Sequence, residues 1–153
     1  MTAPRTGPFW EMLEGRRPPP PSAALLGWRL VAVDPEAGTI RVQFEARPEF
    51  LNPLGTVQGG FLAAMLDDAM GPAATAALGG AAFAQTLELK TSFHRPGRLG
   101  RLYAEGRVVH RGREIVFLEG RLTSPEGELI ASASATARIV PFTAGPDGRR
   151  EAP

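Results

Sequence analysis

The sequence predicts an α+β fold, in which an antiparallel sheet of about six strands packs on one long helix. Three observations support this class. One long helical run, at residues 59–78, has partly alternating apolar segments typical of strands on both sides. Short turn sequences join these segments, which favours antiparallel neighbours because parallel strands need long crossovers. An apolar helix then buries its face against the sheet.

The N-terminal part predicts a short helix followed by a stiff connector. In PFWEMLEG, residues 8–15, proline suits the first turn of a helix and glycine suits its end. The four prolines within residues 16–21 cannot continue that helix, so an extended segment is expected. The 153 residues suit one core. We therefore expect an N-terminal helix and connector at 1–22, a domain at 23–141 and a flexible tail at 142–153.

The strands are predicted from alternation and turn chemistry. Apolar segments at 25–34 and 39–46 predict a hairpin, because PEAG between them supplies turn residues. After the helix, four further segments are separated by the turn sequences PGRL, RGR and PEGE. They span residues 83–95, 100–111, 114–124 and 128–140. Such a sheet has two exposed edges, which formation of a dimer can cover.

The central helix follows a loop at 47–58 and carries two adjacent carboxylates, Asp67 and Asp68, among apolar residues. Helical spacing places Asp67 on a face of small residues, where another backbone can approach closely. No Lys or Arg stands three or four positions away to form a helix ion pair. Because a buried, unpaired carboxylate is costly, the aspartates either lie on a solvated edge, cap a loop, or meet a ligand or partner.

Gly59 and Gly60 stand at the expected N-terminus of this helix. Free N–H groups and the helix dipole there suit a carbonyl oxygen that becomes an oxyanion, although a tight turn alone would also explain two glycines. Gly59 and Asp67 are eight residues apart, about 12 Å along a helix. One helix cannot easily bring both to one carbonyl, whereas two antiparallel copies can. The spacing therefore predicts a site across a two-fold dimer interface.

Composition narrows the function classes. The net charge of +1 gives no basic field for nucleic acid, and the absence of cysteine excludes disulfides, thiolate metal sites and cysteine nucleophiles. No apolar run reaches about 20 residues and no signal peptide is evident, so a cytoplasmic protein that binds no membrane is expected. His94 and His110 are isolated, which predicts no metal site. The chain lacks a P-loop, a dinucleotide fingerprint and an HExxH motif.

The stretch NPLGTVQGG at 52–60, followed by Asp67, resembles the hotdog-fold acyl-CoA thioesterases of the phenylacetic-acid-pathway type. Their usual pattern is N-x-x-G-x-x-H-G-G, with an acid nine residues after the His. TLELKTSFHRP at 86–96 resembles the strand that follows the helix in this family, and the resemblance runs from about residue 8 to 140. It implies a hotdog fold, in which the sheet wraps around one central helix and subunits pair through their sheets.

The resemblance also implies hydrolysis of an acyl-CoA thioester to a free acid and coenzyme A, without a metal or other cofactor. Asp67 matches the catalytic carboxylate, as a general base or a nucleophile, and the nine-residue spacing selects it over Asp68. Gly59 matches the N–H that polarises the thioester carbonyl. Asn52 matches a side chain that helps to hold this carbonyl, and Thr86 matches a hydroxyl that can steady the attacking water.

Gln58 departs from the family pattern, because His is usual at this position. An amide can donate a hydrogen bond but cannot change its charge near neutral pH. Gln58 can therefore replace a His that positions groups, but not one that tunes a proton transfer. The acyl group itself is not specified by the sequence.

Arginines are dense over the turns between the late strands. The turns that match the family's coenzyme-binding segments are flanked by Arg95, Arg98, Arg111 and Arg113. These side chains are expected to clamp the phosphates of coenzyme A, with solvated turn residues as the alternative, and Gly60 is expected to admit the substrate. The expected assembly is a dimer or a dimer of dimers. Two other functions stay open: acyl-CoA binding without catalysis, and hydration or dehydration of an enoyl-CoA.

Overall fold

The computed structural model describes residues 5–144 and 150–151. In chain order its elements are α1 (Pro8–Leu13), α2 (Pro21–Leu25), β1 (Arg29–Asp34), β2 (Thr39–Ala46), the 3-10 turn η1 (Pro48–Phe50), α3 (Gly59–Ala77), β3 (Ala82–Phe93), β4 (Gly100–Arg111), β5 (Ile115–Thr123), β6 (Leu129–Pro141), β7 (Thr143–Ala144) and β8 (Arg150–Glu151).

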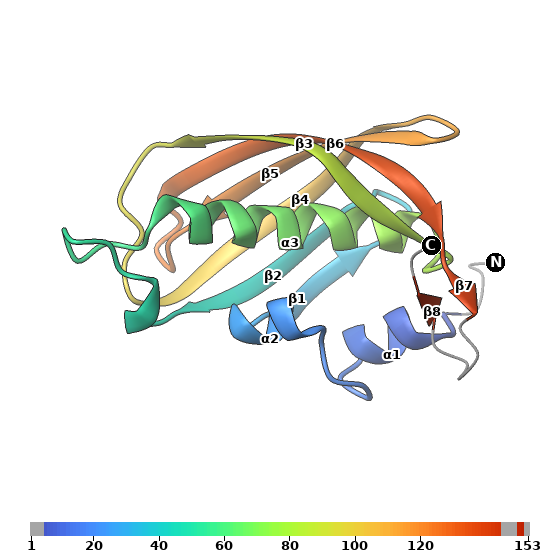
Figure 1. Cartoon of the computed structure of the whole chain (residues 1–153), viewed down its shortest axis with the longest axis horizontal. Coiled ribbons are helices and arrows are strands. Elements are labelled where there is room, and N and C mark those ends of the chain that lie inside the picture. The colour runs from blue at the N-terminus through green and yellow to red at the C-terminus, as the bar shows by residue number, and fades with distance from the viewer. Residues whose placement is uncertain (1–4, 145–149, 152–153) are drawn as a thin grey trace.

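The main sheet confirms the predicted α+β architecture. Among the described residues, six strands pair in the order β1-β2-β4-β5-β6-β3, and every neighbouring pair is antiparallel. Figure 1 shows α3 lying lengthwise along one face of this sheet, which curves around it. The two edges of the sheet are β1 and β3. This arrangement leaves the length of β3 beside the central helix, where the candidate site lies.

The core lies between α3 and the sheet. Leu66, Ala69 and Met70 are fully buried on the helix face that meets the strands. The two glycines Gly106 of β4 and Gly120 of β5, which pair with each other, lie beneath them. A Cβ atom on Gly106 would stand 2.4 Å from the carbonyl oxygen of Ala69, and one on Gly120 would stand 3.1 Å from the side chains of Leu66 and Met70. Glycine therefore permits the close approach of helix and sheet.

The N-terminal region differs from the prediction between residues 21 and 28. A second helix, α2, begins at Pro21, and the first strand begins at Arg29 rather than at Leu25. Pro21 is the first residue of α2, a position where its missing N–H is no loss. Ala23 and Leu26 are buried in the core, so this short helix ties the connector to the domain.

Near the C-terminus, β7 pairs with β8 in a second, two-stranded sheet. Residues 145–149 and 152–153 of the predicted tail lie outside the described residues. The predicted domain boundaries therefore stay predictions.

Candidate active site

A cavity of about 440 Å³ lies between α3, β3 and the N-terminal segment. Its lining is mainly apolar and includes Phe9, Met12 and Trp28. Both aspartates of the central helix, Asp67 and Asp68, also face this space. The sequence left open whether these carboxylates were solvated, caps or parts of a site, and the structure places both of them in one apolar cavity.

Asp67 has a defined partner in this cavity. The hydroxyl of Thr86, on β3, donates a 2.7 Å hydrogen bond to Oδ1 of Asp67. Both side chains are half-buried, so the bond is partly shielded from water. The structure thus brings together two predicted site residues that stand 19 positions apart in the sequence. The pairing fixes the orientation of the carboxylate and leaves its second oxygen available.

A β-bulge in β3 lies next to this pair. The register with β6 shifts between Thr86 and Glu88, so Leu87 is an extra residue in β3. Side chains of a regular strand alternate between faces, and Thr86 and Leu89 would then point to opposite sides. With the bulge, both side chains are half-buried while Leu87 is 59% exposed. Bulges often stand beside functional sites because they re-aim side chains.

Asp68 differs from its neighbour. Its Oδ2 atom is buried and has no hydrogen-bond partner among the described residues. Burial, and then the charge of Asp67, raises the pKa of Asp68 from 3.8 to about 7. A carboxyl group that is partly neutral near pH 7 therefore stands beside the candidate base. The sequence-based choice of Asp67 alone left this second group without a role.

Trp28 is a further cavity residue that the sequence analysis did not find. Its indole N–H donates a 2.9 Å hydrogen bond to the backbone carbonyl of Asp68. Pro72 stands four residues later in α3 and has no N–H, so this carbonyl lacks its usual helical donor. The signal in the sequence was the proline inside the helix, which requires a replacement donor from elsewhere.

Gly59 begins α3, as predicted. Its N–H has no hydrogen-bond partner in the part of the chain that the structure describes. The ring of Phe93, at the end of β3, lies so close that a Cβ on Gly59 would stand 3.1 Å from it. Eight helical residues separate Gly59 from Asp67, about 12 Å. Within one chain these two groups do not share a single reaction centre.

Gln58 caps the central helix. Its side-chain oxygen accepts a 2.7 Å hydrogen bond from the N–H of Gly60. Capping satisfies one of the free donors at the start of the helix. This N–H is therefore already bonded, while the N–H of Gly59 remains for a ligand. The predicted role of Gly60 in admitting the substrate stays a prediction.

Asn52 organises the loop before the helix. Its side-chain oxygen accepts hydrogen bonds from the N–H groups of Leu54 and Thr56, at 3.0 and 3.2 Å. Its side-chain nitrogen donates to the hydroxyl of Thr56 at 2.9 Å. Gly55 completes the turn with a φ of 73°. The N-x-x-G part of the motif thus builds a turn, and the predicted contact of Asn52 with a substrate carbonyl stays a prediction.

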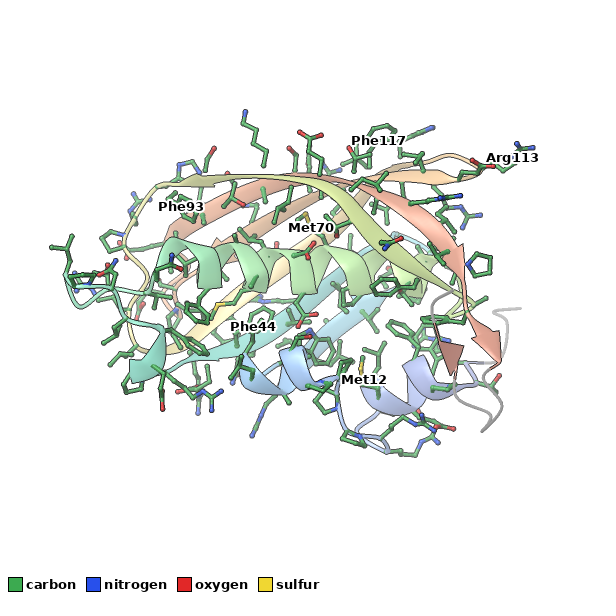
Figure 2. All side chains as sticks on the ribbon, viewed as in Figure 1. Met12, Phe44, Met70, Phe93, Arg113 and Phe117 are labelled. Carbon is green, nitrogen blue, oxygen red and sulfur yellow. The ribbon has the colours of Figure 1, made fainter. Side chains whose placement is uncertain are left out.

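The four predicted phosphate-binding arginines lie at opposite ends of the sheet. Arg98 precedes β4 and Arg111 ends it, and a strand of 12 residues spans about 40 Å. Arg95 donates to the carbonyl of Leu129 at 3.0 Å, and Arg111 to that of Ala77, at the end of α3, at 3.2 Å. Figure 2 shows Arg113 and Phe93 at opposite ends of the molecule. One chain therefore does not gather these arginines into one clamp.

The arrangement suits acid–base chemistry on a small apolar ligand. A carboxylate held by a hydroxyl can take a proton from water, and the apolar lining strengthens its electrostatic effect. No three His, Asp or Glu side chains cluster as metal ligands within the described residues, and the expected absence of a metal stays a prediction. None of the helices described here has the length and apolar character needed to cross a membrane.

Comparison with known proteins adds a family. Residues 54–131 match the thioesterase superfamily. Among solved structures, a phenylacetic acid degradation-related protein from Ralstonia eutropha JMP134 is similar, with 43% sequence identity and a TM-score of 0.81; the match covers 86% of this chain and 98% of that one. The phenylacetic acid degradation protein PaaI from Thermus thermophilus is 29% identical, with a TM-score of 0.69 over 78% of this chain and 98% of that one.

A protein from Streptococcus mutans UA159, bound to acetyl CoA, shares the fold at 24% identity and a TM-score of 0.66, over 81% of this chain and 91% of that one. The comparison with curated proteins gave no significant match.

Proposed function

The chain belongs to the thioesterase superfamily and has its hotdog fold, and from this premise we propose that it hydrolyses an acyl-CoA thioester to a free acid and coenzyme A. The observation that carries the proposal is the 2.7 Å hydrogen bond that holds Asp67 to Thr86 inside an apolar cavity. The fold is able to hold an acyl-CoA, as the Streptococcus mutans protein does.

In the proposed reaction, Asp67 takes a proton from a water molecule whose oxygen attacks the thioester carbon. The C–S bond then breaks, its electron pair leaves with the sulfur of coenzyme A, and the proton passes to the sulfur. Direct attack by the carboxylate, which forms an anhydride that water then hydrolyses, uses the same residue. Thr86 orients Asp67 or the water in both routes.

We further propose that Gly59 acts across a two-fold dimer interface. The N–H of Gly59 polarises the thioester carbonyl that reacts at the partner's Asp67, because one helix holds these groups about 12 Å apart. β3 supports such pairing: it is an edge strand of 12 residues, and it exposes the apolar side chains of Phe83, Leu87 and Phe93. Long apolar edges invite another strand.

The decisive experiment measures release of free thiol from a panel of acyl-CoAs. Asp67→Asn keeps the volume of the side chain but removes the base, so we expect kcat to fall at least 100-fold. Thr86→Val removes the hydroxyl but keeps the shape, and a smaller loss of about tenfold is expected. Glu36→Gln, an exposed carboxylate in the turn after β1, is the control that should retain full activity.

Three results would contradict the proposal. Turnover that survives in Asp67→Asn would remove this residue from the reaction. Tight binding of acyl-CoA without release of thiol by the unmodified protein would favour the non-catalytic binder, in which Gln58 marks lost chemistry. Addition of water to an enoyl-CoA double bond would favour a hydratase.

A further inference from the structure

The cavity around Asp67 has two walls of different origin. One wall comes from the hotdog domain, with residues of α3 and β3. The other wall comes from the N-terminal segment, through Phe9 and Met12 of α1 and the prolines at residues 18–20. The N-terminal segment therefore determines how far the cavity extends away from the central helix.

This wall is anchored to the end of the central helix. Trp10 of α1 is 3% exposed, and its indole N–H donates a 3.1 Å hydrogen bond to the carbonyl of Gly79. A Cβ on Gly80 would stand 2.8 Å from the indole nitrogen, so the seat of Trp10 needs glycine at this position. Leu13 is also buried in the core. α1 is thus docked on the domain by its own buried side chains.

The side chains that face the cavity from α1 are adaptable in size. Phe9 and Met12 are half-buried, and Figure 2 shows the sulfur of Met12 in the space between α1 and α3. Arg17 also lines the cavity, but it is ion-paired with Glu11 at 3.4 Å. With this cation paired, the two aspartates disfavour an anionic ligand. The chemistry of the lining therefore suits a neutral, apolar group.

We propose that α1 is the specificity wall of the acyl site, and that Phe9 and Met12 limit the length of a neutral, apolar acyl group bound next to Asp67. The inference rests on the proposed function, because it assigns the cavity to the acyl part of the substrate. The volume of about 440 Å³ lies in the lower part of the range for small-molecule sites, which is about 300–1,000 Å³.

The test compares kcat/KM for straight-chain acyl-CoAs from acetyl to dodecanoyl. Met12→Trp fills the space and should lower the ratio of dodecanoyl to butyryl turnover at least tenfold, whereas Met12→Ala should raise this ratio by a similar factor, because one methylene in a pocket is worth about 10–200-fold. Leu13→Ala is the matched control: it truncates a buried residue of α1 outside the cavity lining and should leave the ratio unchanged.

A ratio that stays within about twofold of the unmodified protein in both Met12 variants would overturn the inference. Circular dichroism checks folding; if Met12→Trp does not fold, Met12→Ala and Phe9→Leu carry the test, both in the direction of longer chains. If no acyl-CoA is hydrolysed, the proposed function fails separately, and calorimetry on the same panel replaces turnover. A changed ratio of Kd values then supports the wall, while an unchanged ratio or no binding overturns it.

Discussion

At the scale of single residues, the two adjacent aspartates of α3 have different surroundings although both face one cavity. Successive helix positions differ by about 100°, so Asp67 turns toward β3 and receives the Thr86 hydroxyl, while the Oδ2 atom of Asp68 has no partner within the described residues. Periodicity could not choose between them, because the choice depends on which side chain of β3 reaches the helix.

The raised pKa of Asp68 predicts a pH-dependent stability. Its pKa is about 7 in the folded chain and 3.8 as the ordinary value, so folding favours the protonated form. The contribution of Asp68 to stability is full below about pH 4 and is lost as the pH rises through 7, by at most about 4 kcal/mol. Asp68→Asn should therefore gain stability over the unmodified protein between pH 4 and pH 8, measured by denaturant unfolding.

Comparing the variant with the unmodified protein at each pH cancels the other titrating groups. A difference in unfolding free energy that is the same at pH 4 and pH 8 would contradict the assignment of this titration to Asp68.

At the scale of elements, the contact between α3 and the sheet depends on the missing side chains of Gly106 and Gly120. The helix backbone at Ala69 lies where a Cβ on Gly106 would be. Close contact of this kind leaves little room for adjustment, because the obstructing atom is backbone rather than the end of a flexible side chain.

Gly106→Ala should therefore destabilise the protein by about 1–3 kcal/mol or more in denaturant unfolding. Gly71→Ala is the matched control within α3, where a Cβ would meet nothing within 4 Å. The same substitution there should stabilise by about 0.5–1 kcal/mol, because glycine is unfavourable inside a helix. Equal effects at the two positions would show that the contact with Ala69 is not the cause.

The elements that the sequence predicted well are those with a long, regular pattern. The run at 59–78 and the four late strands have enough residues for their period to be visible, and the structure confirms them within one or two residues. α2 was missed because five residues are too few to show a helical period, and because Pro21 was interpreted as part of the connector rather than as a helix start.

At the scale of the whole molecule, one chain holds an incomplete version of the proposed site. Asp67 stands in the cavity at the middle of α3, while Gly59 stands at the helix start. The pairing of Asp67 with Thr86 was predictable as residue identities but not as a contact. The separation of Arg98 from Arg111 could not be predicted from their density in the sequence, since it follows from the length of β4.

Mixed dimers test whether the site is shared. Gly59→Pro removes the N–H, and proline suits this first helical position because the backbone of Gln58 is extended, with φ of −61° and ψ of 135°. Gly59→Pro and Asp67→Asn should each be inactive alone. After they are mixed and refolded together, about a quarter of the unmodified activity should return, because each mixed dimer has one intact site. Continued inactivity of the mixture would place both groups in one chain.

Both indole rings of this protein report on the same helix. The chain has two tryptophans, and each donates its N–H to a backbone carbonyl at or near α3, Trp28 to Asp68 and Trp10 to Gly79. Trp28 also lines the cavity, whereas Trp10 does not. The protein thus carries its own fluorophore at the pocket and a second one at the anchor of the wall, so that occupancy and loosening can be followed optically without a label.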